Sequence, residues 1–141
     1  VIRLFGFTPK VAFLSHSTFG QPMTSRTKHI RDAVEILKNK KVEFKFDGDM
    51  QPDVALSDEY KDLYPFSEIV GNANILIMPG QHSAAISYKM MKELGDTKVI
   101  GPLLIGLGLP IEIAPLRTST SELINLASIA AYSADVIDYK K

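Results

Sequence analysis

The sequence predicts an α/β fold with three layers, in which a mostly parallel sheet carries helices on both faces. Short apolar runs alternate with segments of helical periodicity in the order β-α-β-α-β-α-β-β-α. This alternation is typical of parallel sheets covered by helices. With 141 residues, 45% of them hydrophobic, the chain has the size of one domain with a substantial core. We therefore expect a single domain over residues 1–141.

The first half of the chain is expected to form two strands and two helices. The apolar run 10–15 predicts a buried strand, and residues 24–39 carry apolar side chains at the spacing of one helix face. The alternating stretch 42–47 predicts a half-buried strand. Residues 53–64 predict a second helix that ends before Pro65.

The second half is expected to add three strands and two helices. The apolar run 74–79 predicts a buried strand, followed by a helix over 83–94 that Gly95 ends. Residues 98–107 and 110–114 are predicted as two further strands.

The last helix is expected to open with a capping box. Ser119 lies three residues before Glu122, which is the spacing of that motif. The apolar positions expected on one face of this helix are Leu123, Leu126, Ala127 and Ala130.

Composition excludes several classes of function. Sixteen basic residues balance sixteen acidic ones, and the basic stretch 38–41 stands alone, so a nucleic-acid binder is not indicated. The absence of cysteine excludes disulfides and thiolate chemistry. The most apolar window, 99–116, holds three prolines, three glycines and Glu112, so we expect no membrane helix. No signal peptide is visible, and the start at Val1 suggests a piece of a longer polypeptide.

Familiar ligand motifs are missing or incomplete. Residues 106–110 begin like a dinucleotide fingerprint but lack its third glycine, and no P-loop or nucleophile elbow is present. The three histidines, His16, His29 and His82, lack the spacing of metal ligands. We predict no metal site in this chain.

The carboxyl ends of the predicted strands are the expected place for a ligand, as in other parallel sheets. The hydroxyls and N–H groups of loop 15–20 can hold an anion near a helix N-terminus, or they can satisfy their own loop backbone. For residues 47–51 we expect a tight turn, although a functional loop is the alternative. Arg117 is either an anion-binding residue or a surface charge.

Five blocks of sequence, in order, resemble the phosphate acetyl/butyryl transferase family and cover nearly the whole chain from Lys10 to Ala131. The resemblance implies the second, C-terminal part of the phosphotransacetylase fold, an isocitrate/isopropylmalate dehydrogenase-like subdomain. The blocks are 10–20, 46–56, 64–80, 87–110 and 121–127.

Two regions of the chain depart from the pattern of the true transferases. Phe19 stands where their first loop carries a lysine. Their later Asp-Leu-Ser-Arg-Gly block falls on residues 113–117, where Pro115 replaces the serine and Leu116 the arginine. Arg117 is offset by one residue, so we expect no catalytic residue in this chain. Acyl-phosphate chemistry needs fixed positive charge and hydrogen-bond donors, which proline and leucine cannot supply.

Residues 15–20, 78–84 and 116–119 look more like the domain fused to the C-terminus of large bacterial malic enzymes. The resemblance implies a cytoplasmic parent whose N-terminal malic enzyme domain oxidatively decarboxylates malate to pyruvate. That domain would use NADP or NAD and a divalent metal, Mg²⁺ or Mn²⁺, whereas this chain would hold no cofactor. The fused domain is associated with homo-oligomer assembly and with sensing acetyl-CoA.

The resemblance and the strand-end placement together nominate contacts for an acyl-CoA-type metabolite. Two alternatives stay open: a functional phosphate acetyl/butyryltransferase with an unusual loop, and a purely structural dimerisation unit. The candidate residues are Ser17, Thr18, Gly20, Gln81, His82, Arg117 and Thr118.

Overall fold

The computed structural model describes residues 2–96 and 98–136. Its internal contacts divide the chain into two compact units, Val1–Lys89 and Met90–Lys141. Each unit is described by itself below, and the single domain expected from chain length stays a prediction.

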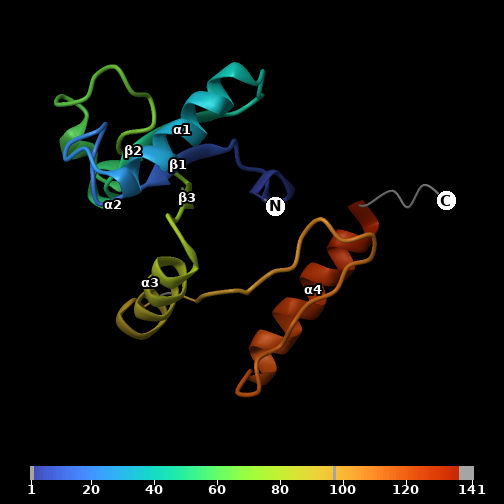
Figure 1. Cartoon of the computed structure of the whole chain (residues 1–141). Coiled ribbons are helices and arrows are strands. Elements are labelled where there is room, and N and C mark those ends of the chain that lie inside the picture. The colour runs from blue at the N-terminus through green and yellow to red at the C-terminus, as the bar shows by residue number, and fades with distance from the viewer. Residues whose placement is uncertain (1, 97, 137–141) are drawn as a thin grey trace. The chain divides into compact units, whose positions relative to one another are not determined.

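The first unit is built on a parallel sheet of three strands. They are β1 (Lys10–Leu14), β2 (Lys45–Met50) and β3 (Ile75–Ile77), in the order β2-β1-β3, with β1 in the centre (Figure 1). Both strand pairs are parallel, so the carboxyl ends of the three strands meet at one edge of the sheet. The predicted α/β class with a parallel sheet is confirmed.

Helix α1 (Ser25–Asn39) packs against β1 and β2. Thr24 caps it in a reciprocal arrangement, in which its hydroxyl accepts a hydrogen bond from the backbone of Thr27 and its own N–H donates to the Thr27 hydroxyl. Such a capping box satisfies two of the free N–H groups at a helix start. The buried apolar residues of α1 are Ile30 and Val34, one turn apart as the periodicity predicted.

The main core lies against the other side of the sheet. Alternate residues of β1, Ala12 and Leu14, point into it, as the period of two in a strand requires. The partners come from the end of β2, the short helix α2 (Pro52–Leu56) and the segment before β3. This core consists of Ala12, Leu14, Met50, Val54, Ala55, Ile69 and Val70.

Several predicted elements of the first unit differ in their bounds, and the largest differences concern β2 and the helix expected after it. Strand β2 covers 45–50 in place of 42–47, so the turn expected at 47–51 is wrong over most of its length. The helix expected over 53–64 is interrupted, because it consists of α2 and a 3₁₀ helix, η2 (Asp58–Tyr60). Ser57 separates them, since its hydroxyl accepts a hydrogen bond from the backbone of Glu59 and starts the second segment.

Two further helices come before the first strand and after the last strand of the sheet. A 3₁₀ helix, η1 (Ile2–Phe5), precedes β1, and α3 (Gln81–Leu94) follows β3. Helix α3 begins two residues before the predicted start and ends where predicted, with the N–H of Gly95 donating to the carbonyl of Met91 at 3.0 Å.

The second unit contains α4 (Thr120–Val136) preceded by an extended segment. No strand occurs among residues 98–136, so the strands predicted at 98–107 and 110–114 are wrong. Their apolar side chains suit a strand, but a strand also needs a neighbour to pair its backbone, and two prolines, Pro102 and Pro110, lack the N–H donors for such pairing.

The capping box predicted for the last helix is confirmed. The Ser119 hydroxyl accepts a hydrogen bond from the N–H of Glu122 at 3.3 Å, and the carboxylate of Glu122 accepts one from the N–H of Ser119 at 2.7 Å. The apolar face expected on α4 is not buried throughout, because Leu126 is buried whereas Leu123 is 47% exposed. Within the described ranges, the helices are too short or too polar to cross a bilayer.

Candidate functional site

The loop after β1, residues 15–20, is a buried polar segment at the carboxyl edge of the sheet. Ser17 is completely buried, while Ser15 and Thr18 are each 8% exposed. The Ser15 N–H donates to the carbonyl of Met50 at 2.9 Å, which ties the start of the loop to the end of β2. The loop is therefore part of the packed interior, where its polar groups need partners.

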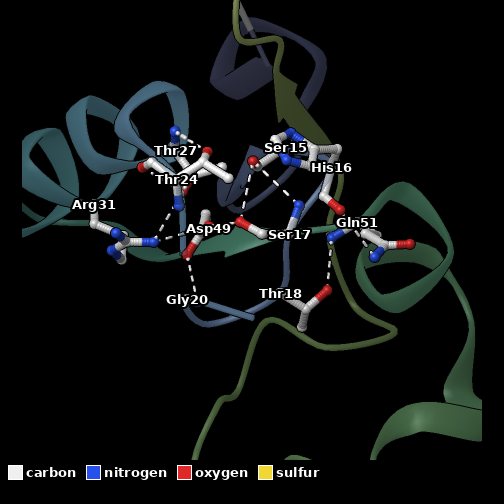
Figure 2. Close-up of polar contacts among 10 residues, drawn as sticks. All are labelled: Ser15, His16, Ser17, Thr18, Gly20, Thr24, Thr27, Arg31, Asp49 and Gln51. Carbon is white, nitrogen blue, oxygen red and sulfur yellow. Dashed lines mark hydrogen bonds and ion pairs between the residues drawn. The ribbon is translucent and has the colours of Figure 1, made fainter. Parts of the chain in front are cut away.

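Asp49 supplies those partners. Its side chain is completely buried, and the hydroxyl of Ser17 donates a hydrogen bond to its Oδ2 atom. The N–H of Gly20 donates to Oδ1 at 3.1 Å (Figure 2). The carboxylate of Asp49 therefore takes up two of the donors that the sequence nominated for an external anion.

A bulge at the end of β2 directs Asp49 into the loop. Phe13 pairs with Gly48 and Leu14 pairs with Met50, so Asp49 is the extra residue between two paired positions. A bulge of this kind re-aims the side chain of the extra residue. Gly48 adopts a φ of +152°, and a Cβ atom there would lie 2.6 Å from the carbonyl oxygen of Phe13. The close approach of the two strands therefore requires glycine.

Arg31 provides the balancing positive charge from helix α1. Its Nη1 atom lies 3.6 Å from the Oδ2 atom of Asp49 and donates to the hydroxyl of Thr27 at 3.1 Å. The Arg31 side chain is 23% exposed, and it reaches from the helix toward Asp49 in Figure 2. A buried carboxylate is tolerated when it is paired and hydrogen-bonded in this way.

Thr18 connects the loop to the start of α2. Its hydroxyl accepts a hydrogen bond from the backbone N–H of Gln51 at 3.2 Å, and its own N–H donates to the carbonyl of Gln21 at 3.0 Å. The side-chain amide of Gln51 donates to the carbonyl of His16 at 3.1 Å, whereas the His16 residue itself is exposed. Thr18 therefore hydrogen-bonds backbone groups in and next to its own loop. This is the structural role that the sequence allowed for the loop hydroxyls as an alternative to anion binding.

Phe19 closes the outer side of the loop with an aromatic contact. Its ring centroid lies 5.2 Å from that of Tyr64 and 4.8 Å from that of Phe66. Its φ of +47° is unusual for a residue other than glycine, and its N–H donates to the carbonyl of Asp49 at 2.6 Å. The position that holds a lysine in the transferase pattern therefore holds an apolar ring packed on other rings.

The remaining candidates lie elsewhere. Gln81 and His82 are exposed in the first turn of α3, beyond the carboxyl end of β3. Arg117 and Thr118 belong to the second unit, where Arg117 is exposed and the Thr118 hydroxyl donates to the carbonyl of Pro115 at 2.5 Å. Of the seven candidates, Ser17, Thr18 and Gly20 are brought together around or beside Asp49.

Asp49 and Arg31 were missed by reasoning from sequence. The signal for Asp49 was the glycine before it, because an isolated glycine in a strand pattern often marks a bulge. The signal for Arg31 was its spacing from Thr27 and Val34, which places all three on the buried face of α1. Among the residues that the structure describes, no group of three His, Asp or Glu side chains is arranged to hold a metal ion.

In the second unit, charged and polar groups meet at the N-terminus of α4. The Ser119 backbone N–H, the Lys92 ammonium and the Ser119 hydroxyl all hydrogen-bond the Glu122 carboxylate, and they lower its pKa from the usual 4.5 to about 2. Lys92 Nζ lies 3.0 Å from Glu122 Oε1. The negative charge that a helix N-terminus favours is therefore supplied here by Glu122 of the same chain.

Comparison with known proteins places the chain in a family. The family model for phosphate acetyl/butaryl transferase matches residues 1–131. The chain belongs to this family. The phosphotransacetylase from Streptococcus pyogenes superposes on it with a TM-score of 0.87 and 32% sequence identity, over 95% of this chain and 41% of that one.

Within the family, malic enzymes are among its similar relatives. The chain is 50% identical to the NADP-dependent malic enzyme of Rhizobium meliloti over 94% of its own length, and it covers 17% of that enzyme. It is 35% identical to the phosphate acetyltransferase of Bacillus subtilis, again over 94% of its length, and covers 41% of that enzyme. The chain thus corresponds to a part of each of these relatives.

Proposed function

We propose that this chain is a non-catalytic phosphotransacetylase-like domain at the C-terminus of a malic enzyme. In this proposal the parent is a cytoplasmic homo-oligomer whose linked N-terminal domain converts malate to pyruvate with NADP or NAD and Mg²⁺ or Mn²⁺. The chain described here binds an acetyl-CoA-type metabolite and regulates that reaction. The similarity to a malic enzyme at 50% identity, against 35% for a phosphate acetyltransferase, supports this parent.

The observation that carries the non-catalytic role is the packing of Phe19. Transfer to or from phosphate develops negative charge, which enzymes stabilise with fixed cations and donors. Here the position of the family lysine is an aromatic ring in contact with Tyr64 and Phe66. The nearest cation of the loop, Arg31, is already paired with Asp49. The loop therefore lacks a free positive charge for a reacting phosphate.

The burial of some candidate residues leaves fewer of them available to contact a regulatory ligand. The hydroxyl of Ser17 and the N–H of Gly20 are engaged by Asp49, so they are the weaker candidates. The exposed side chains of Gln81, His82 and Arg117 are the candidates with accessible polar groups. A thioester ligand with phosphate groups would use such donors and positive charge.

The test is titration of acetyl-CoA into the full-length parent enzyme while the rate of malate oxidation is followed. We expect saturable binding and a changed rate, with both effects weakened in His82→Ala or Arg117→Ala. Gln21→Ala, which truncates an exposed side chain directly after the loop of residues 15–20, serves as the matched control. Absence of binding together with an unchanged rate of malate oxidation would refute the regulatory role.

A further inference from the structure

We propose that the first loop, residues 15–20 after β1, forms a binding site for an oxyanion, here called the cradle. The carboxylate of Asp49 from the same chain occupies this site. This internal carboxylate excludes inorganic phosphate and other small oxyanions from the loop. The inference goes beyond the proposed function, because it concerns how the loop is occupied and does not depend on acetyl-CoA or on the parent enzyme.

The donors around Asp49 form the set that proteins use to bind carboxylates and phosphates. They are two hydrogen-bond donors, the hydroxyl of Ser17 and the backbone N–H of Gly20, and one cation, the Arg31 guanidinium, which forms an ion pair with Asp49 at 3.6 Å. Hydrogen bonds and ion pairs of this kind are strongest when the acceptor is an anion. All three converge on the two oxygens of a single carboxylate that is completely buried.

The elements of the fold hold these donors in place without Asp49. Gly20 lies against Arg31, since a Cβ atom on it would be 3.6 Å from the Arg31 Nη1 atom. The Arg31 Nη1 atom is also held by the hydroxyl of Thr27. Ser17 is fixed by Ser15, whose hydroxyl accepts a hydrogen bond from the Ser17 N–H at 3.3 Å. Removal of the carboxylate would therefore leave a preorganised set of donors.

A surface cavity lies beside this position. This cavity, of about 590 Å³, is bordered by Asp49, Arg31 and Phe19, and its other charged lining residues are Asp32, Glu35, Asp47 and Lys38. With Asp49 in place, an anion that entered the cavity would meet a like charge that already holds the donors. Without it, the same cavity gives a small anion access to the guanidinium.

The experiment replaces Asp49 with alanine in the full chain and tests two probes, formate and inorganic phosphate. Formate has the shape of the deleted carboxylate. Melting temperature and calorimetric binding are measured at constant ionic strength, with chloride as the reference salt. We expect Asp49→Ala to bind formate saturably, with a rise in melting temperature, and to gain phosphate binding that the original chain lacks.

Three variants sharpen the result. Asp58→Ala removes an exposed carboxylate paired with Lys61, away from the loop, and should gain no binding. Asp49→Asn keeps the cradle filled and should also gain none. Adding Arg31→Gln to Asp49→Ala should weaken formate binding by about tenfold or more, because the bound anion loses its positively charged partner.

A variant that fails to fold still gives an answer. If Asp49→Ala is unfolded in chloride, the readout becomes recovery of near-ultraviolet circular dichroism on adding formate. An ordinary buried ion pair predicts destabilisation that neither anion reverses, and that outcome would overturn the proposal. Equal binding of phosphate by the original chain and by Asp49→Ala would overturn it as well.

Discussion

The hydroxyl of Ser17 donates a hydrogen bond to the carboxylate of Asp49, although the two residues are 32 positions apart in the sequence. This contact joins the loop after β1 to the bulge at the end of β2, and both groups are completely buried. A loop that could have received a ligand is thus closed by a side chain from the neighbouring strand. The stability of the first unit should depend on this contact.

Replacement of Ser17 by alanine should lower the free energy of unfolding by about 1–3 kcal/mol, because the buried carboxylate loses a donor. The measurement is urea denaturation. Ser121→Ala, at an exposed position of α4, is the control and should change that free energy by less than about 0.5 kcal/mol. Equal effects of the two substitutions would contradict the assignment of Ser17 as a structural donor.

Replacement of Gly48 by alanine should destabilise the chain by at least about 2 kcal/mol, since it combines a strained backbone with a close contact. The new Cβ atom would meet the carbonyl oxygen of Phe13 at 2.6 Å and would force β1 and β2 apart. Gly80→Ala is the matched control, because a Cβ atom there has nothing within 4 Å. Thermal unfolding of both variants measures the difference, and similar melting temperatures would argue against the bulge.

Truncation of Phe19 to alanine should cost about 1–3 kcal/mol, the sum expected for two aromatic pairs and some lost apolar burial. Chemical denaturation gives this value. Phe7→Ala should cost less, because Phe7 is 61% exposed. If Phe19→Ala were as stable as the original chain, the aromatic contact with Tyr64 and Phe66 would not close the loop.

Glu122 predicts a pH dependence for helix α4. Because its folded pKa of about 2 lies below the usual 4.5, its contribution to stability is complete above pH 4.5 and is lost as the pH falls through about 2. The variant Glu122→Gln lacks this titration, so its unfolding free energy should change less over that range. Circular dichroism of both proteins during acid titration measures the difference, and parallel curves would contradict the assigned role of Glu122.

The sequence correctly predicted those elements for which the local pattern of residues matches the packing in the fold. Helix α1 is an example, because Thr24 caps it and Ile30 and Val34 mark its buried face. Prediction from sequence failed where a strand depends on hydrogen bonding to the backbone of a neighbouring strand. The segments 98–107 and 110–114 have the apolar character of strands, yet no pairing neighbour is present among residues 98–136.

The candidate site was predicted in part for a similar reason. Local reasoning located the loop 15–20 and its hydroxyls, but it could not show that Asp49 occupies their donors. That contact depends on the register between β1 and β2, which is shifted by one residue at the bulge. Register is set by the packing of whole strands, so one side chain in a turn-like sequence does not reveal it.

We propose that this chain keeps the fold of a phosphotransacetylase without its chemistry. The most direct measurement is formation of acetyl phosphate from acetyl-CoA and inorganic phosphate by the full-length protein. We expect no turnover above the uncatalysed rate, at protein and substrate concentrations at which acetyl-CoA binding is saturated. Turnover that is proportional to protein concentration and is abolished by Arg117→Ala would contradict it.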